Sequence, residues 1–179
     1  MGVGVPLVIL AAVVAPWDAH DDLNVDTLFH DELCVICSKR NKWSRRRGVK
    51  LADLAGEPWV LPSASGFLFR VMQKAFAAEG LDMPRATVTT KSTYALSVLV
   101  ANGPFLAIHP GTMLTTPNEY PQLAAVDVRL RETRGPIGLI TLKGRSPSPV
   151  AKLFLQVGVQ VVKSIRPARS RAAARKVAP

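Results

Sequence analysis

The feature that most constrains the fold is the run 49–79, in which a strand, a short polar loop and an amphipathic helix follow one another. The strand Pro58–Leu61 ends at Pro62, the loop 63–66 follows, and Phe67–Glu79 repeats apolar residues at helical spacing. In open α/β sheets, small anions bind where the carboxyl end of a strand leads into a helix. The run therefore predicts an α/β fold with a small-molecule site.

Further predicted strands and helices alternate along the chain. Strands are expected at 32–38, 85–90, 105–109, 123–128 and 137–142, and helices at 92–101 and from Ser148-Pro149 onwards. Residues 3–15 are almost wholly apolar but too few to span a bilayer, which needs about 20 residues, so they predict a buried strand. This alternation predicts the α/β class with a largely parallel sheet.

Composition limits the classes of protein that the chain can belong to. Its 179 residues suit one medium domain or two small lobes, and 48% hydrophobic residues are too many for a disordered chain. The two cysteines cannot form a disulfide framework, which indicates a reducing, cytoplasmic setting. Cys34 and Cys37 have C-x-x-C spacing, but on a strand they point to opposite faces. We therefore interpret them as buried small residues.

Positive charge is concentrated in two places. Residues 163–179 hold six of the 23 Lys and Arg and no acid, which leaves 17 basic against 13 acidic residues elsewhere. Arg45–Arg47 form a second cluster. We interpret 166–179 as a disordered, solvated tail, with loose phosphate binding as the alternative.

Four segments, taken in order, resemble the effector-binding domain of LysR-type transcriptional regulators. They are DDLNVDTLFHDELCVICSKRNKW (21–43), LADLAGEPWVLP (51–62) with its Ser/Gly loop and helix, VLVANGPFLAIHP (98–110) and PIGLITLKGRSPSPVAKLFL (136–155). The resemblance covers roughly residues 20 to 165 and implies a periplasmic-binding-protein-like fold. Such a fold has two α/β lobes with mixed, mostly parallel sheets, two crossing strands and a ligand cleft.

By this resemblance we divide the chain into five parts. Residues 1–19 are an atypical apolar N-terminus, 20–45 a first-lobe remnant and crossing strand, 46–132 the second lobe, 133–165 the return strand and first-lobe helix, and 166–179 the tail. The first lobe is expected to be incomplete, and the family's winged helix-turn-helix does not occur in this sequence.

The resemblance also implies a function. It predicts a cytoplasmic ligand-sensing module, which is not an enzyme and has no cofactor, no metal and no membrane partner. The ligand would be a small organic effector, with carboxylates as candidates, and the intact regulator would be a homodimer. DNA would be bound only through the helix-turn-helix that this chain lacks.

The first candidate ligand contacts lie in the loop Ser63, Ala64, Ser65 and Gly66. Its hydroxyls and backbone N–H groups stand at the positive end of a helix dipole, which suits a carboxylate. The alternative is that Ser65 only caps the helix, which Gly80 would end.

The second group of candidate contacts surrounds the next predicted helix. Ser92 and Thr93 open that helix, and Gly103 and Phe105 follow its end. A phenyl ring at position 105 would narrow the pocket and favour an apolar or aromatic effector; alternatively, Phe105 belongs to the core. His20, His30 and His109 are scattered, and no catalytic constellation stands out.

Three other interpretations stay open. The chain could be a stand-alone solute-binding protein of similar fold, or a truncated regulator fragment that folds only in part. DNA binding through the Arg-rich tail is the third.

Overall fold

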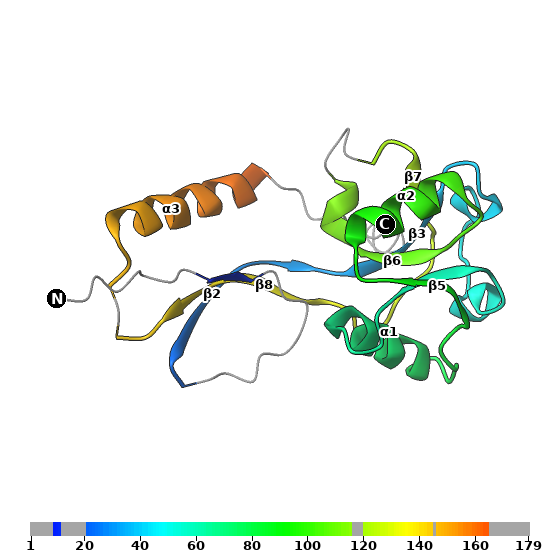
Figure 1. Ribbon diagram of the computed structural model, residues 1–179, viewed down its shortest axis with the longest axis horizontal. Helices are drawn as coiled ribbons and strands as arrows, with labels where there is room; N and C mark the ends of the chain where they lie inside the picture. Colours follow the sequence, from blue (N-terminus) through cyan, green and yellow to red (C-terminus); the bar gives the residue numbers. More distant parts are fainter. Residues whose placement is uncertain (1–8, 12–20, 116–119, 145, 165–179) are drawn as a thin grey trace, which may run out of the picture. The chain divides into compact units, whose positions relative to one another are not determined.

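The computed structural model describes residues 9–11, 21–115, 120–144 and 146–164, which belong to two compact units (Figure 1). Unit 1 holds the described residues up to Asp31 and those from Gly135 onwards, and unit 2 holds those from Glu32 to Arg134. The chain therefore passes between the units twice. The segment 20–45, expected to hold a first-lobe remnant and a crossing strand, passes from unit 1 to unit 2 between Asp31 and Glu32, and β3 (Leu33–Ser38) is a strand of the unit 2 sheet.

Unit 2 is built on a mixed sheet. Besides β3, its strands are β4 (Trp59–Pro62), β5 (Ala86–Thr90), β6 (Ala107–Pro110) and β7 (Leu123–Ala125). β4 pairs with β5 in parallel, and a parallel bridge between Trp59 and Leu106 joins it to β6. β3 is antiparallel to both β6 and β7. Only β3 thus runs against the other four strands, which confirms a mixed, mostly parallel sheet.

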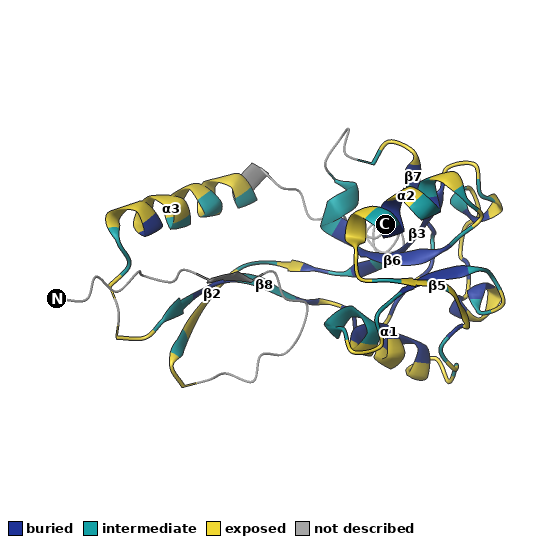
Figure 2. Ribbon diagram, in the orientation of Figure 1, coloured by how far each residue is buried: buried dark blue, intermediate teal, exposed yellow. Residues whose placement is uncertain are grey.

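Two helices cover opposite faces of this sheet (Figure 1). α1 (Phe67–Ala77) packs on one face, where Phe76 and Cys37 are fully buried, and α2 (Thr93–Asn102) packs on the other. Cys34 packs against the α2-side cluster. The two cysteines therefore point to opposite faces, as predicted from strand alternation. Figure 2 shows the mostly buried strands β3 and β6 between the two helices.

Short helical turns connect these elements: η1 (Lys42–Ser44), η2 (Leu51–Leu54) and η3 (Gly111–Leu114). Gly80 has φ +69°, and just beyond it the Leu81 N–H donates to the Phe76 carbonyl at 3.0 Å. Gly80 therefore ends α1 in the left-handed conformation that glycine adopts easily, as expected.

Unit 1 is built on β8 (Gly135–Leu142), which pairs antiparallel with β1 (Ile9–Ala11) and β2 (Leu23–Asp31). The mostly parallel pairing predicted for both lobes is therefore wrong for this sheet. The reason is that β2 leads out of unit 1 and β8 returns into it, so these neighbours run in opposite directions. Gly138 allows the close approach, because a Cβ there would lie 2.8 Å from the Asp26 carbonyl oxygen.

The last helix of unit 1 is α3 (Pro149–Ser164). Ser148 caps it, since its Oγ accepts the Ala151 N–H at 3.2 Å, which confirms the predicted start. The N-terminal strand prediction is confirmed at Ile9–Ala11, whereas most of 1–19 and the tail 166–179 lie outside the described residues. Within the described part of the chain, no helix has both the length and the hydropathy to cross a membrane.

Candidate functional site

Three parallel strands of unit 2 end at the same edge of the sheet. Pro62 at the end of β4 pairs with Thr90 at the end of β5, and β6 runs parallel to β4 and ends at Pro110. We name the segments that follow these ends, 62–66, 90–93 and 110–111, the carboxyl edge, and the opposite side of the sheet the amino edge. Both α1 and α2 begin at the carboxyl edge.

The loop between β4 and α1 turns back on itself at the carboxyl edge. The Gly66 N–H donates to the Ser63 carbonyl at 2.8 Å, and the hydroxyls of Ser63 and Ser65 lie 3.2 Å apart. The expectation that Ser65 caps α1 is wrong. The turn gives the extended capping conformation to Gly66, and the Ser65 hydroxyl is hydrogen-bonded to that of Ser63 instead.

As a result, no side chain caps the N-terminus of α1 among the described residues. The first N–H groups of a helix have no intrahelical acceptor, so they are left to water or to a ligand. Arg70, one turn into α1, is exposed and its Nη1 donates to the Ser65 carbonyl at 3.4 Å. Ala64 and Ser65 are exposed at the tip of the loop.

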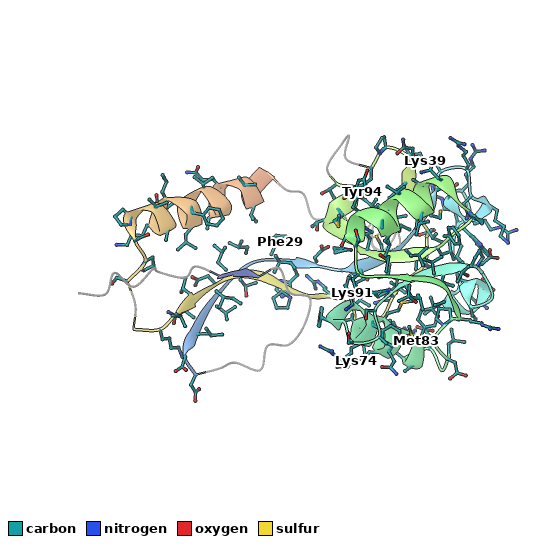
Figure 3. The ribbon with its side chains drawn as sticks, viewed as in Figure 1. Phe29, Lys39, Lys74, Met83, Lys91 and Tyr94 are labelled. Carbon is teal, nitrogen blue, oxygen red and sulfur yellow. The ribbon has the colours of Figure 1, made fainter. Side chains whose placement is uncertain are left out.

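The second helix start at this edge is capped. Ser92 Oγ accepts the Ala95 N–H at 3.2 Å, and the Ser92 N–H donates to Thr90 Oγ1 at 3.1 Å. Thr93, the first residue of α2, is exposed. Lys91 and Tyr94 mark this end of α2 in Figure 3. The structure thus brings Ser92 and Thr93 to the same sheet edge as the loop 63–66.

A buried hydrogen-bonded chain lies behind the start of α2. Ser97 Oγ lies 2.9 Å from the Thr93 carbonyl oxygen and 3.2 Å from His109 Nε2, and His109 is only 2% exposed. The carbonyl can only accept, so Ser97 donates its one proton to it and His109 Nε2–H donates to Ser97. Burial lowers the pKa of His109 to about 4, which keeps the imidazole neutral at pH 7.

The hydrogen bonds that join Thr93, Ser97 and His109 were not predicted from the sequence. A histidine at the end of an apolar strand was visible, but its partner Ser97 sits on a helix twelve positions earlier. Nδ1 of His109 is buried without a hydrogen-bond partner among the described residues. The His109–Ser97 pair therefore fixes the first turn of α2 against β6.

Gly103 and Phe105 lie elsewhere. They follow the C-terminus of α2 and precede β6, which places them at the amino edge, away from the loop 63–66. The Phe105 ring covers Gly103 so closely that a Cβ on Gly103 would lie 2.6 Å from it. Phe105 also packs against the α2-side core. The structure does not bring these two predicted contacts together with the other six.

Gly103 nevertheless lines an open pocket of about 430 Å³ at the amino edge. The lining residues come from three segments: Ser38, Arg40, Asn41 and Lys42, then Glu57 and Pro58, and finally Ala101, Asn102, Gly103 and Pro104. No group of three His, Cys, Asp or Glu in the described ranges could hold a metal ion. Burial raises the pKa of Cys37 to about 11, so this thiol stays protonated.

Solved structures show that this two-unit α/β fold is that of effector-binding domains. The regulatory domain of CcmR from Synechocystis PCC6803, in complex with 2-PG, matches with a TM-score of 0.71 at 18% identity, over 86% of this chain and 73% of that one. The effector-binding domain of QuiR in complex with shikimate matches with a TM-score of 0.64 at 18% identity, over 84% and 70%.

The chain belongs to the LysR substrate binding domain family, which it matches over residues 10–162. It is 25% identical over 126 residues to the HTH-type transcriptional regulator GbpR of Azospirillum brasilense, and 31% identical over 72 residues to GbpR of Rhizobium radiobacter. These matches cover 70% and 40% of this chain, but only 37% and 24% of the two relatives. The family consists of regulator domains and is not an enzyme family.

Proposed function

We propose that the chain is the effector-sensing part of a LysR-type transcriptional regulator and that a small organic anion binds at the carboxyl edge of unit 2. The observation that carries this proposal is the meeting of two helix N-termini at one sheet edge, of which the α1 terminus has no side-chain cap among the described residues. Helix N-termini attract anions through their free N–H groups and their dipole.

The ligand class follows from the polar groups at this edge. Ser63 and Thr93 offer hydroxyls, and Arg70 is the nearest cation in sequence to the loop. A few neutral donors with one flexible cation suit a single carboxylate better than a multiply charged phosphate. The solved relatives CcmR and QuiR were captured with 2-PG and shikimate, which supports a small organic effector in general.

Signalling would work by shifting the populations of different arrangements of the two units. A ligand that binds one arrangement of the two units more tightly than another shifts their equilibrium by its difference in affinity. In the intact regulator, a cytoplasmic homodimer, this shift would reposition helix-turn-helix domains on DNA. The domain itself would perform no catalysis.

The test is a calorimetric titration of the full chain with shikimate and a panel of aliphatic and aromatic monocarboxylates. At least one compound should bind saturably. Ser63→Ala and Thr93→Val should each weaken it about three- to tenfold, the usual effect of losing one hydrogen bond.

Thr87→Val is the matched control, because Thr87 is exposed on β5 outside the carboxyl edge. Its affinity should stay within about twofold of the parent, as for a surface change remote from the site. If a ligand bound both Ser63→Ala and Thr93→Val with the affinity of the parent, its site would lie away from the carboxyl edge.

A further inference from the structure

The segment Lys39–Lys50 at the amino edge, here named the basic segment, is the most highly charged stretch among the described residues. It contains seven basic side chains and no acid. All seven are exposed: Lys39, Arg40, Lys42, Arg45, Arg46, Arg47 and Lys50. In Figure 3, the labelled Lys39 stands among side chains that end in nitrogen.

Neighbouring carboxylates neutralise little of this charge. Glu57 pairs with Lys42 at 2.6 Å. Asp53 and Asp127 instead accept backbone N–H groups, those of Lys50 and Gly48. Across the described ranges, none of the other six basic side chains forms an ion pair. Counting these three acids against the seven basic residues leaves a local charge of +4.

The backbone of the basic segment is held in place. Asn41 Oδ1 accepts the Trp43 N–H at 3.0 Å, and Asn41 Nδ2 donates to the Pro104 carbonyl at 3.2 Å. Trp43 is buried, with Lys42 Nζ and Arg46 Cζ 5.2 and 5.0 Å from its ring centroid. The cations are therefore arranged on an ordered scaffold, which lowers the entropy lost when they bind a partner.

The shape of the surface favours an extended polyanion. Lys39, Arg40, Asn41, Lys42 and Arg45 line an open pocket of about 540 Å³, and Arg46 and Arg47 continue the charge beyond it. A membrane surface is disfavoured, since membrane-binding segments expose aromatic or aliphatic side chains beside their cations. Here the apolar residues of the segment, Trp43 and Val49, are buried.

We propose that the basic segment binds the phosphate backbone of double-stranded DNA, independently of base sequence and of the effector site at the opposite sheet edge. Lys and Arg side chains neutralise phosphates and release condensed counterions, so such binding weakens steeply with salt. Arg45, Arg46 and Arg47 make the phosphate contacts, with Lys39 and Arg40 extending the surface.

The test uses the full chain and a fluorescein-labelled 20-base-pair duplex, with binding followed by anisotropy from 25 to 200 mM salt. The variant Arg45→Glu/Arg46→Glu/Arg47→Glu should raise Kd at least tenfold at the lowest salt. The slope of log K against log salt should become shallower by about 2 to 3, because each lost phosphate contact contributes about 0.9. A second, unrelated duplex should give the same result.

The matched control is Lys74→Glu/Lys143→Glu/Lys152→Glu, which changes the net charge equally at exposed positions on α1, just after β8 and on α3. It should change Kd less than threefold. Equal losses in both variants would mean that only net charge matters, and unchanged binding in the first would place the contacts elsewhere; either result overturns the proposal. Tight binding of a poly-glutamate peptide without duplex binding would also overturn it, in favour of an acidic protein partner.

Thermal unfolding shows whether the first variant is folded. If it is not, Arg45→Gln/Arg47→Gln keeps Arg46 on the Trp43 ring and should raise Kd at least threefold with a slope shallower by about 2. Absence of that change would overturn the proposal. Carboxylate binding should be the same in these variants and in the parent, which separates this test from that of the effector site.

Discussion

The two edges of the unit 2 sheet share their strands but differ in chemistry. The carboxyl edge offers hydroxyls, backbone N–H groups and two helix N-termini, whereas the amino edge carries seven exposed cations next to the helix C-terminus at Gly103. Helix dipoles account for part of this division, since they favour anions at N-termini and cations at C-termini. Alternating helices and parallel strands thus give the domain one face suited to a small anion and another suited to a polyanion.

The edges also differ in how they are built. The carboxyl edge rests on a buried hydrogen-bonded chain through Ser97 and His109, while the amino edge rests on a buried ring, Trp43, with cations above it. The first arrangement is sensitive to protonation and the second to salt.

The largest effect should come from the shared core. Phe76 is fully buried on α1, and its ring meets that of Trp59 edge-on, with centroids 5.9 Å apart. Phe76→Ala should lower the free energy of unfolding by about 3–5 kcal/mol, through lost burial and the cavity left behind. Urea denaturation measures this, and carboxylate and duplex binding should decline in parallel as the folded fraction falls.

Phe154→Ala is the control for that experiment. Phe154 lies on α3 of unit 1 and is 49% exposed, so its loss should cost less than about 1 kcal/mol. If the two substitutions had equal cost, or if Phe76→Ala abolished only one kind of binding, the two edges would not share a single core.

Local patterns explain why much of this fold could be predicted. Apolar spacing predicted a helix at 67–79, observed as Phe67–Ala77, and Ser148 was identified as a cap from its position before a proline. These features depend on residues within a few positions of each other. The antiparallel pairing of β8 depends on partners more than a hundred residues away and has no local signal.

The candidate site was predicted less well, for two physical reasons. Ser65 has the residue type of a cap, but the turn that closes on the Ser63 carbonyl decides that Gly66 takes the capping position. Gly103 and Phe105 were predicted as contacts because, by the resemblance, the residues before the next strand form the other wall of the cleft. In a βαβ unit the helix runs back along the sheet, so residues after the helix must lie at the opposite edge.

A pH dependence should distinguish the carboxyl edge. Burial holds the pKa of His109 at about 4, below the ordinary value of 6.5, so the unfolded chain binds a proton first as pH falls. The stability that this residue contributes is present above pH 6.5 and is lost progressively towards pH 4. A shift of this size corresponds to about 3 kcal/mol. Its burial partners are Ser97 and the Tyr120 ring.

Denaturation at pH 7.5, 6, 5 and 4 measures this contribution. His109→Gln should flatten the profile between pH 6.5 and 4, whereas His30→Gln, which keeps His109, should leave it unchanged. A profile equally steep in the His109 variant would assign the acid sensitivity to other groups.

Replacing each of two buried tryptophans by phenylalanine should lower the free energy of unfolding by different amounts, and this difference is smaller than the effect of His109. Trp59 Nε1 donates to the Leu54 carbonyl at 2.8 Å, whereas Trp43 Nε1 is buried without an acceptor among the described residues. Trp59→Phe removes a satisfied hydrogen bond and leaves a buried carbonyl with one partner fewer. We expect it to lower the free energy of unfolding by about 1–2 kcal/mol more than Trp43→Phe. Equal costs in urea denaturation would show that ring volume alone matters.

The smallest effects should come from one glycine at each edge. Gly48, in the basic segment, has φ +61° with open space around it, whereas Gly66 has an ordinary φ of −81° but a Cβ there would lie 3.0 Å from the Ser63 carbonyl oxygen. A substitution at Gly48 is limited by the left-handed backbone conformation, and one at Gly66 by contact with the Ser63 carbonyl oxygen. Gly48→Ala should therefore lower the free energy of unfolding by about 1 kcal/mol, and Gly66→Ala by a similar amount or less. Asparagine tolerates the left-handed region, so Gly48→Asn should recover most of that cost in thermal unfolding. Gly66→Asn should recover none of it, because its Cβ meets the same oxygen; recovery at both positions would mean that the loop 63–66 relaxes freely and is not a preformed anion site.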